Sequence, residues 1–285
     1  MAQSFGYARP KYLGEAFDIL DSYGTDASPL AGGTDLIVGV RTGRIAPRIL
    51  VDLKRITDLF PGICSTDGGV SIAAPTTLTD IIADDLIRRH FPALVQAAGT
   101  IGSVQIRNRA TLTGNICNAS PAADTAPALL AYGAEVVLVS REGSRPVRLE
   151  EFFLGPRRTS LRAGEIAAGV QIPIPVARTG SHFARLTRRR GVDLATISLC
   201  CAVGTQVTRF AFGAVGPKPF VLSDDSGVLA NPDSEPAARL EVLRHFVGSA
   251  APISDLRGSR LYRQAMLMTL SQRALTTAIA HRDRA

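Results

Sequence analysis

Two glycine-containing turns constrain the fold of this chain most strongly, because runs of small residues let a ligand lie directly against the backbone. The first, residues 30–36 (LAGGTDL), carries paired glycines, and the second, residues 111–115 (TLTGN), carries a glycine before an asparagine. They lie about 75 residues apart, and neither is a GxGxxG or a GxxxxGK[ST] motif. Successive backbone N–H groups in such turns can face an anion. One turn alone is mainly a structural feature, but two in one α/β chain could share a long diphosphate ligand.

The second turn lies near the start of a stretch that is poor in bulky and charged side chains. Residues 110–139 contain no histidine, lysine or arginine and one aspartate, Asp124. Ser120 and Pro121 predict the N-cap and first residue of a helix that ends at Gly133. The Asp124 carboxylate could accept hydrogen bonds from a ribityl or ribose hydroxyl, or it could cap the helix.

Apolar periodicity and turn residues predict alternating helices and strands along the chain. In the N-terminal part the predicted helices are 15–24, closed by Gly24, a helix within 77–91 capped by Thr77 or Thr79, and one that starts at Pro92 and ends at Gly99 and Gly102. Strands are predicted at 49–53, 69–73 and 135–140, and an arginine-rich turn at 141–149. Farther along, sheet strands are predicted within 193–207 and 208–217, and amphipathic helices at 240–247 and 259–279.

A strand interrupted by two prolines, residues 171–177, predicts a domain boundary. The expected organisation is an N-terminal domain of residues 1–177, with subdomains of about 1–55 and 56–177, followed by a domain of residues 178–285. The expected fold class is α+β.

Composition narrows the function classes. With 46% hydrophobic and 20% charged residues and no long apolar run, the chain is expected to be a cytoplasmic globular protein without a membrane span. The four cysteines form no CxxC pair, which argues against a metal site and favours buried reduced thiols. The net charge is +7, but the densest basic run, 185–190, has no aromatic interleaving. A solvated or anion-facing surface is therefore favoured over nucleic-acid binding.

Six segments, in order along almost the whole chain, resemble the flavin subunit of the xanthine dehydrogenase family of molybdenum hydroxylases, which also occurs in carbon monoxide dehydrogenases. They are FGYARPKYLGEAFDIL (5–20), LAGGTDLIVGVRTG (30–43), IGSVQIRNRATLTGNICNASPAADTAPALLA (101–131), FFLGPRRTSLRAGEI (152–166), RRRGVDLATISL (188–199) and ISDLRGSRLYRQAM (253–266). The resemblance implies a two-subdomain FAD-binding fold of the vanillyl-alcohol oxidase and p-cresol methylhydroxylase type, followed by a smaller α+β domain.

The resemblance also implies a set of cofactor-binding residues and no catalytic residue on this chain. The first turn would wrap the FAD diphosphate through backbone N–H groups of Leu30, Ala31, Gly32, Gly33, Thr34, Asp35, Leu36 and Ile37. The second would be formed by Thr111, Leu112, Thr113, Gly114 and Asn115. Further contacts would come from Ile101, Ser120, Asp124, Ala167 and Arg185.

Three positions depart from the family pattern. Thr113 stands where the family usually has the first glycine of Gly-Gly-Asn, and Pro156 stands in place of a tyrosine. Arg185 stands where lysine is frequent, which keeps the charge but changes its geometry.

The family division of labour places substrate oxidation on a molybdopterin-binding large subunit and two [2Fe-2S] clusters on a small subunit, in a hetero-oligomer expected to be a dimer of heterotrimers. The flavin subunit would take electrons singly and pass pairs to NAD+, oxygen or a quinone. Two alternatives stay open. The chain could be a stand-alone FAD-dependent oxidoreductase that acts on a small organic molecule, or a non-catalytic assembly subunit that has lost FAD.

Overall fold

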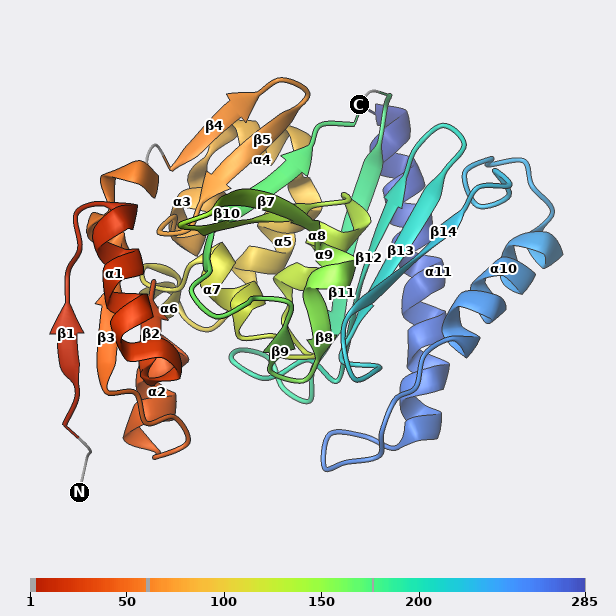
Figure 1. The fold of residues 1–285 in the computed structure, drawn as a ribbon. Coiled ribbons are helices and arrows are strands. Elements are labelled where there is room, and N and C mark those ends of the chain that lie inside the picture. The colour runs from red at the N-terminus through yellow and green to blue at the C-terminus, as the bar shows by residue number, and fades with distance from the viewer. Residues whose placement is uncertain (1–3, 60–61, 176, 285) are drawn as a thin grey trace.

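The computed structural model describes residues 4–59, 62–175 and 177–284. A small parallel sheet, in the order β1-β3-β2, begins the chain (Figure 1). Its strands and flanking helices are β1 (Gly6–Ala8), α1 (Leu13–Tyr23), β2 (Ala27–Leu30), α2 (Leu36–Arg41) and β3 (Ile49–Asp52). Short 3-10 turns occupy Gly24–Asp26, Leu53–Arg55 and Thr57–Leu59. Since parallel strands align their carboxyl ends, the residues that follow β2 and β3 leave the sheet at one edge.

The second sheet is antiparallel, in the order β4-β5-β10-β6-β7. Its strands are β4 (Ile63–Thr66), β5 (Gly69–Ala73), β6 (Glu135–Ser140), β7 (Gly143–Arg148) and β10 (Ile166–Pro173). Between β5 and β6 the chain forms α3 (Leu78–Ala83), α4 (Asp85–His90), α5 (Pro92–Gly99), α6 (Val104–Arg107), α7 (Leu112–Cys117) and α8 (Thr125–Ala131). After β7 come α9 (Leu149–Phe152), β8 (Phe153–Gly155) and β9 (Arg158–Thr159).

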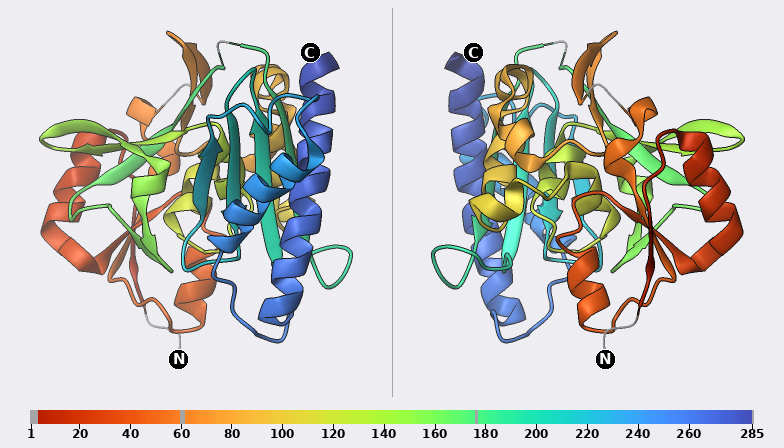
Figure 2. Two further views of the ribbon diagram at one scale, coloured as in Figure 1. Left: turned by 90° about the vertical axis from the view of Figure 1, so that its right-hand side faces the viewer. Right: turned by 90° about the vertical axis from the view of Figure 1, so that its left-hand side faces the viewer.

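The third sheet is antiparallel and is covered on both faces (Figure 2). It contains β11 (Gly180–Leu186), β12 (Ile197–Val203), β13 (Thr208–Gly213) and β14 (Phe220–Asp224), followed by α10 (Pro236–Gly248) and α11 (Arg260–Arg284). Every residue of β12 is buried, and successive side chains of a strand point to opposite faces. Cys200 packs in the core formed with α5 and α8, whereas Cys201 packs in the core formed with α10 and α11. The two parts of the chain therefore share a hydrophobic interface.

Many elements agree with the sequence-based predictions. The helix closed by Gly24, the strands at 49–53, 69–73 and 135–140, the helix from Pro92, strands β12 and β13, and helices α10 and α11 are confirmed within one to a few residues. Strands β11 and β14 were not predicted. Thr77 is the N-cap of α3 in a reciprocal capping box with Asp80. The helix predicted within 77–91 is divided, because the backbone of Asp84 is extended and its side chain caps α4.

Three local predictions are wrong. The helix expected from Pro121 begins at Thr125, because Pro127 is tolerated only in a first helical turn. The arginine-rich segment expected to be a turn forms edge strand β7, where Pro146 is compatible with the missing N–H. The second turn, residues 111–115, is not a loop but the N-cap and first helical turn of the short helix α7 (Leu112–Cys117). Within the described residues, no helix is long and apolar enough to cross a membrane.

A buried arginine fastens the start of α11 to the third sheet. Arg263 is 1% exposed, and its guanidinium donates to the backbone oxygens of Thr196 (2.7 Å) and Ala214 (3.2 Å). It also pairs with Asp255 at 2.6 Å. Hydrogen bonds from Arg257, and then from Arg263, hold the pKa of Asp255 far below its usual value against the effect of burial.

Arg263→Met should lower the free energy of unfolding by about 3 kcal/mol, because two carbonyls lose a buried donor and the Asp255 carboxylate loses one of its two arginine partners. Arg260→Met, at the exposed first residue of the same helix, should change it by less than about 0.5 kcal/mol. Urea denaturation of the two variants measures both values. Equal stability of the two variants would contradict the anchoring role of Arg263.

Candidate functional site

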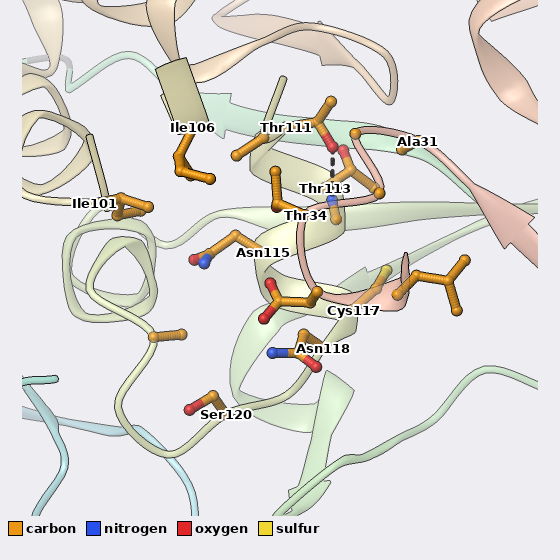
Figure 3. A pocket seen from close by; sticks show the side chains of 18 of the residues that line it. Ala31, Thr34, Ile101, Ile106, Thr111, Thr113, Asn115, Cys117, Asn118 and Ser120 are labelled. Atoms are coloured by element: carbon orange, nitrogen blue, oxygen red, sulfur yellow. Dashed lines mark hydrogen bonds between the residues drawn. The ribbon is translucent and has the colours of Figure 1, made fainter. Parts of the chain in front are cut away.

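One cavity of about 710 Å³ lies where the parallel sheet, the helices between β5 and β6, and the loop after β11 meet (Figure 3). From the first turn and its surroundings it is lined by Pro29, Ala31, Gly32, Gly33, Thr34, Asp35, Leu36, Ile45, Leu53 and Ala74. From the helical region it is lined by Thr100, Ile101, Gly102, Ile106, Ala110, Thr111, Thr113, Gly114, Asn115, Cys117, Asn118, Ser120, Ala122, Ala123 and Asp124. The remaining lining residues are Leu161, Glu165, Ile166, Ala167, Arg189, Val192, Asp193 and Leu194.

The first turn presents a row of free backbone donors. It runs from the carboxyl end of β2 to α2, and Gly33 adopts a left-handed conformation with φ of 80°, which favours glycine. Within the part of the chain that the structure describes, the N–H groups of residues 32–36 donate to no protein acceptor; the N–H of Ile37 is the first to bond, to Gly33 O at 3.0 Å. Consecutive unpaired N–H groups of this kind form a concave anion-binding surface.

The second turn contributes donors from the opposite side of the cavity. Thr111 is the N-cap of α7, and its hydroxyl accepts a bond from the N–H of Gly114 at 3.0 Å. The N–H groups of Leu112 and Thr113 make no hydrogen bond with described residues. The Oδ1 of Asn115 accepts from the Thr125 hydroxyl at 2.6 Å, which leaves the side-chain N–H₂ group available to the cavity.

The first turn touches the backbone of the two residues that directly precede the second turn. A Cβ atom built on Gly32 would lie 2.0 Å from the carbonyl oxygen of Arg109 and 3.0 Å from the Cα of Ala110. No side chain fits between them, so only glycine permits this approach. The contact places residues 32–36 beside the start of α7, and donors from both turns face the same space.

The cavity has apolar walls on either side of these donors. Near the parallel sheet and β10 it is lined by Pro29, Ile45, Leu53, Ala74 and Ile166. Ile101 and Ile106 form apolar lining on the other side, and Val192 and Leu194 of the loop after β11 add further apolar lining. In Figure 3, Ala31 and Ile101 stand at opposite sides, with Thr34 and Thr113 between them. An anion-binding centre flanked by two apolar walls suits a diphosphate that joins two flat ring systems.

Two buried polar atoms on the lining residues have no partner among the described residues. They are the hydroxyl oxygen of Thr113 and Oδ1 of Asp124. Thr113 is 3% exposed and Asp124 is 7% exposed. The other carboxylate oxygen of Asp124 accepts from Arg185 Nη1 at 2.5 Å. Burial raises the pKa of Asp124, and the Arg185 guanidinium and, to a smaller extent, the Thr100 hydroxyl oppose that rise. Buried polar groups are normally hydrogen-bonded, so these two atoms indicate a site that a polar ligand completes.

Most of the sequence-predicted site residues are brought together. Those that line the cavity are Ala31, Gly32, Gly33, Thr34, Asp35, Leu36, Ile101, Thr111, Thr113, Gly114, Asn115, Ser120, Asp124 and Ala167. The cavity lining does not include Leu30, Ile37, Leu112 or Arg185. Arg185 reaches the site through its ion pair with Asp124, which connects β11 to the start of α8.

Sequence reasoning missed the contribution of the loop after β11 as a cavity wall. The site is also lined by four residues of the loop that joins two strands of the third sheet, β11 and β12: Arg189, Val192, Asp193 and Leu194. The only signal was the resemblance of segment 188–199 to the family. The wall formed by Leu53, Ala74 and Ile166 carried no local signal either, because the three come together only in the folded core.

The cysteine thiols of the chain are free, and the one that lines the cavity is protonated. Burial raises the pKa of the Cys117 thiol to about 12, so it stays protonated at neutral pH. Cys200 and Cys201 are buried and free, as predicted, whereas Cys64 and Cys117 are half-buried. No set of three or more His, Cys, Asp or Glu side chains converges within residues 4–59, 62–175 and 177–284.

Comparisons with known proteins identify the family of the chain. Residues 3–175 match the family described as FAD binding domain in molybdopterin dehydrogenase, and residues 182–278 match the family described as CO dehydrogenase flavoprotein C-terminal domain.

Individual relatives match over nearly their whole length. The carbon monoxide dehydrogenase medium chain of Hydrogenophaga pseudoflava is 32% identical over 97% of this chain and 97% of its own. The xanthine dehydrogenase FAD-binding subunit of Escherichia coli O157:H7 is 30% identical over 96% of each chain. A chain in the structure of reconstituted CO dehydrogenase from Oligotropha carboxidovorans is similar with a TM-score of 0.91, at 30% identity and covering 99% of both chains.

Gly32→Ala should weaken FAD binding at least about tenfold, because the new methyl group must push the first turn away from Arg109 and separate the two sets of donors. Gly14→Ala is the matched control, since a Cβ there meets nothing within 4 Å. The dissociation constants of both variants can be measured by quenching of flavin fluorescence. Unchanged affinity in Gly32→Ala would show that the contact between the turns is not needed for binding.

Proposed function

Since the chain belongs to the FAD-binding medium subunits of the xanthine and carbon monoxide dehydrogenase family, we propose that it is the electron-transfer subunit of a molybdenum hydroxylase. The family resemblance, the α+β fold with a smaller C-terminal domain, and FAD as cofactor are confirmed by these relatives. In the proposed role the chain takes electrons from [2Fe-2S] clusters on a small subunit and passes them to NAD+, oxygen or a quinone. The substrate to be oxidised binds to a molybdopterin-containing large subunit, and the three kinds of subunit form a dimer of heterotrimers. A cytoplasmic location stays a prediction.

The observation that carries the proposal is a cavity whose donors come from two turns and whose buried polar atoms lack partners. The N–H groups of residues 32–36 and of Thr113 would hold the diphosphate. Oδ1 of Asp124 would accept a hydrogen bond from a hydroxyl group of the ligand, while Arg185 holds the carboxylate in place. Bound FAD supplies the redox chemistry that links one-electron donors to two-electron acceptors.

The charged groups of the cavity favour electron transfer over the alternative of a stand-alone oxidoreductase. Among the described lining residues no histidine, lysine or tyrosine occurs, and three of the four carboxylates are paired with arginines. Asp124 pairs with Arg185, Glu165 with Arg145 at 2.7 Å, and Asp193 with Arg188 at 3.2 Å; the fourth, Asp35, is exposed at the N-cap of α2. A direct oxidation of an organic substrate is accelerated by an acid or base held in place beside the flavin, whereas the one unpaired carboxylate of the described lining, that of Asp35, is exposed in the first turn.

Three residues of the cavity lining have exposed apolar side chains that a partner subunit would cover. Ile106, Val192 and Leu194 are 40%, 57% and 59% exposed. The arginines of segment 188–190 lie in the same loop as Val192 and add positive charge. This combination suits a docked protein on the apolar residues and an anionic acceptor near the arginines.

The purified chain should bind FAD non-covalently, because the described lining contains a single cysteine, whose thiol is protonated, and no histidine or tyrosine. Acid precipitation should release intact FAD into the supernatant. Yellow colour that stays in the pellet, or FMN in the supernatant, would contradict the proposed binding mode.

The FAD-loaded chain alone should oxidise no purine, aldehyde or N-heterocycle, and flavin reduction by one of these compounds should require the molybdenum and iron–sulfur subunits. Isolation of the tagged chain from its native host tests the assembly, because iron, molybdenum and flavin should co-purify in a fixed ratio. Robust substrate oxidation by the chain and FAD alone would make the stand-alone oxidoreductase correct. A chain isolated without flavin that cannot be reloaded would favour the non-catalytic assembly subunit.

A further inference from the structure

We infer that Lys54 is a positioning residue for the first turn, which it holds in the orientation that exposes the Gly32 N–H to the cavity. The Lys54 ammonium donates to the carbonyl oxygen of Ala31 at 3.0 Å. It lies in the 3-10 turn directly after β3, whereas Ala31 directly follows β2. The inference rests on the proposed function and extends it to a residue outside the cavity lining.

The direction of the N–H follows from the planarity of the peptide bond. The C=O of Ala31 and the N–H of Gly32 belong to one trans peptide unit, so they point in opposite directions. A bond that fixes the carbonyl toward Lys54 therefore fixes the N–H away from Lys54. Gly32 lines the cavity, and its N–H has no acceptor among the described residues. Lys54 thus orients the first donor of the row formed by residues 32–36.

The lysine is itself held by a buried carboxylate. Asp52 is 2% exposed, and its Oδ1 accepts from the Lys54 ammonium at 2.5 Å and from the Lys54 backbone N–H at 3.0 Å. Its other oxygen accepts from the hydroxyl of Tyr7 on the neighbouring strand β1. Burial alone would raise the pKa of Asp52, but the hydrogen bonds from Lys54 and Tyr7 keep it below its usual value. Strands β1 and β3 together therefore define where the ammonium lies, and the ammonium defines the turn.

Lys218 provides a matched control in the same chain. Its ammonium also donates to two backbone carbonyls, those of Phe153 at 2.8 Å and Glu150 at 3.3 Å. Neither carbonyl belongs to a residue that lines the cavity. Lys218→Met therefore removes a lysine–carbonyl tether and a positive charge of the same kind without touching the turn.

The test measures FAD dissociation constants of Lys54→Met, Lys54→Arg and Lys218→Met by fluorescence quenching, together with melting of the apo-proteins. Lys54→Met should weaken FAD binding about tenfold, Lys54→Arg should recover part of the loss, and Lys218→Met should stay within about twofold of the wild type. The double variant Asp52→Asn with Lys54→Met avoids an unpaired buried carboxylate, and it should show the same loss if the single variant folds poorly.

Salt separates orientation from simple charge. At about 1 M salt the Debye length falls to about 3 Å, so a long-range effect of the ammonium is screened. The ratio between Lys54→Met and the wild type should persist at this salt concentration. Disappearance of the ratio, or normal affinity in both Lys54→Met and the double variant, would overturn the positioning role. Failure of the wild-type chain itself to bind FAD would instead overturn the proposed function, and this inference with it.

Discussion

The close approach of Gly32 to the backbone of Arg109 and Ala110 is the contact on which the site depends. The two turns lie far apart in the sequence, and each alone offers only a few unpaired N–H groups. Because Gly32 has no Cβ, the first turn can approach the start of α7 closely. Both sets of donors then face one cavity. The parallel sheet positions the first turn at the carboxyl edge of β2 and β3, and the capping hydroxyl of Thr111 positions the second. The binding surface is therefore backbone, preorganised by elements on either side.

The third sheet is part of this site as well as a separate layer. Since β12 is buried on both faces, the sheet packs against α5 and α8 as closely as against its own helices. That packing brings Arg185 to Asp124 and the loop after β11 to the cavity. Loss of the third sheet would thus remove a wall of the site and leave the buried carboxylate of Asp124 without its cation. Cofactor binding and the association of the two parts of the chain are expected to stabilise each other.

The sequence predicted those features of the fold that depend on interactions between residues close together in the chain. Thr77 with Asp80 and the glycine turn at residues 32–33 carry their signals within a few residues. The helix expected from Pro121 failed because Pro127 sets a later start, and β7 was missed because Pro146 and its arginines resemble a turn when the neighbouring strand is ignored. Most of the residues that the family resemblance implied line the cavity, but they make up fewer than half of its lining. It could not supply Lys54, whose role follows from a hydrogen bond between two strand ends that only the folded parallel sheet brings together.

The central claim is that both turns and both apolar walls bind one ligand that spans them. A comparison of FAD, FMN and riboflavin as ligands of the purified chain tests it most directly. FAD should bind at least about 100-fold more tightly than FMN, because FMN lacks the adenylate half and leaves one apolar wall and part of the donor row unused. Riboflavin, without any phosphate, should bind more weakly still. Equal affinity for FAD and FMN would contradict a shared cradle and would assign recognition to the flavin end alone.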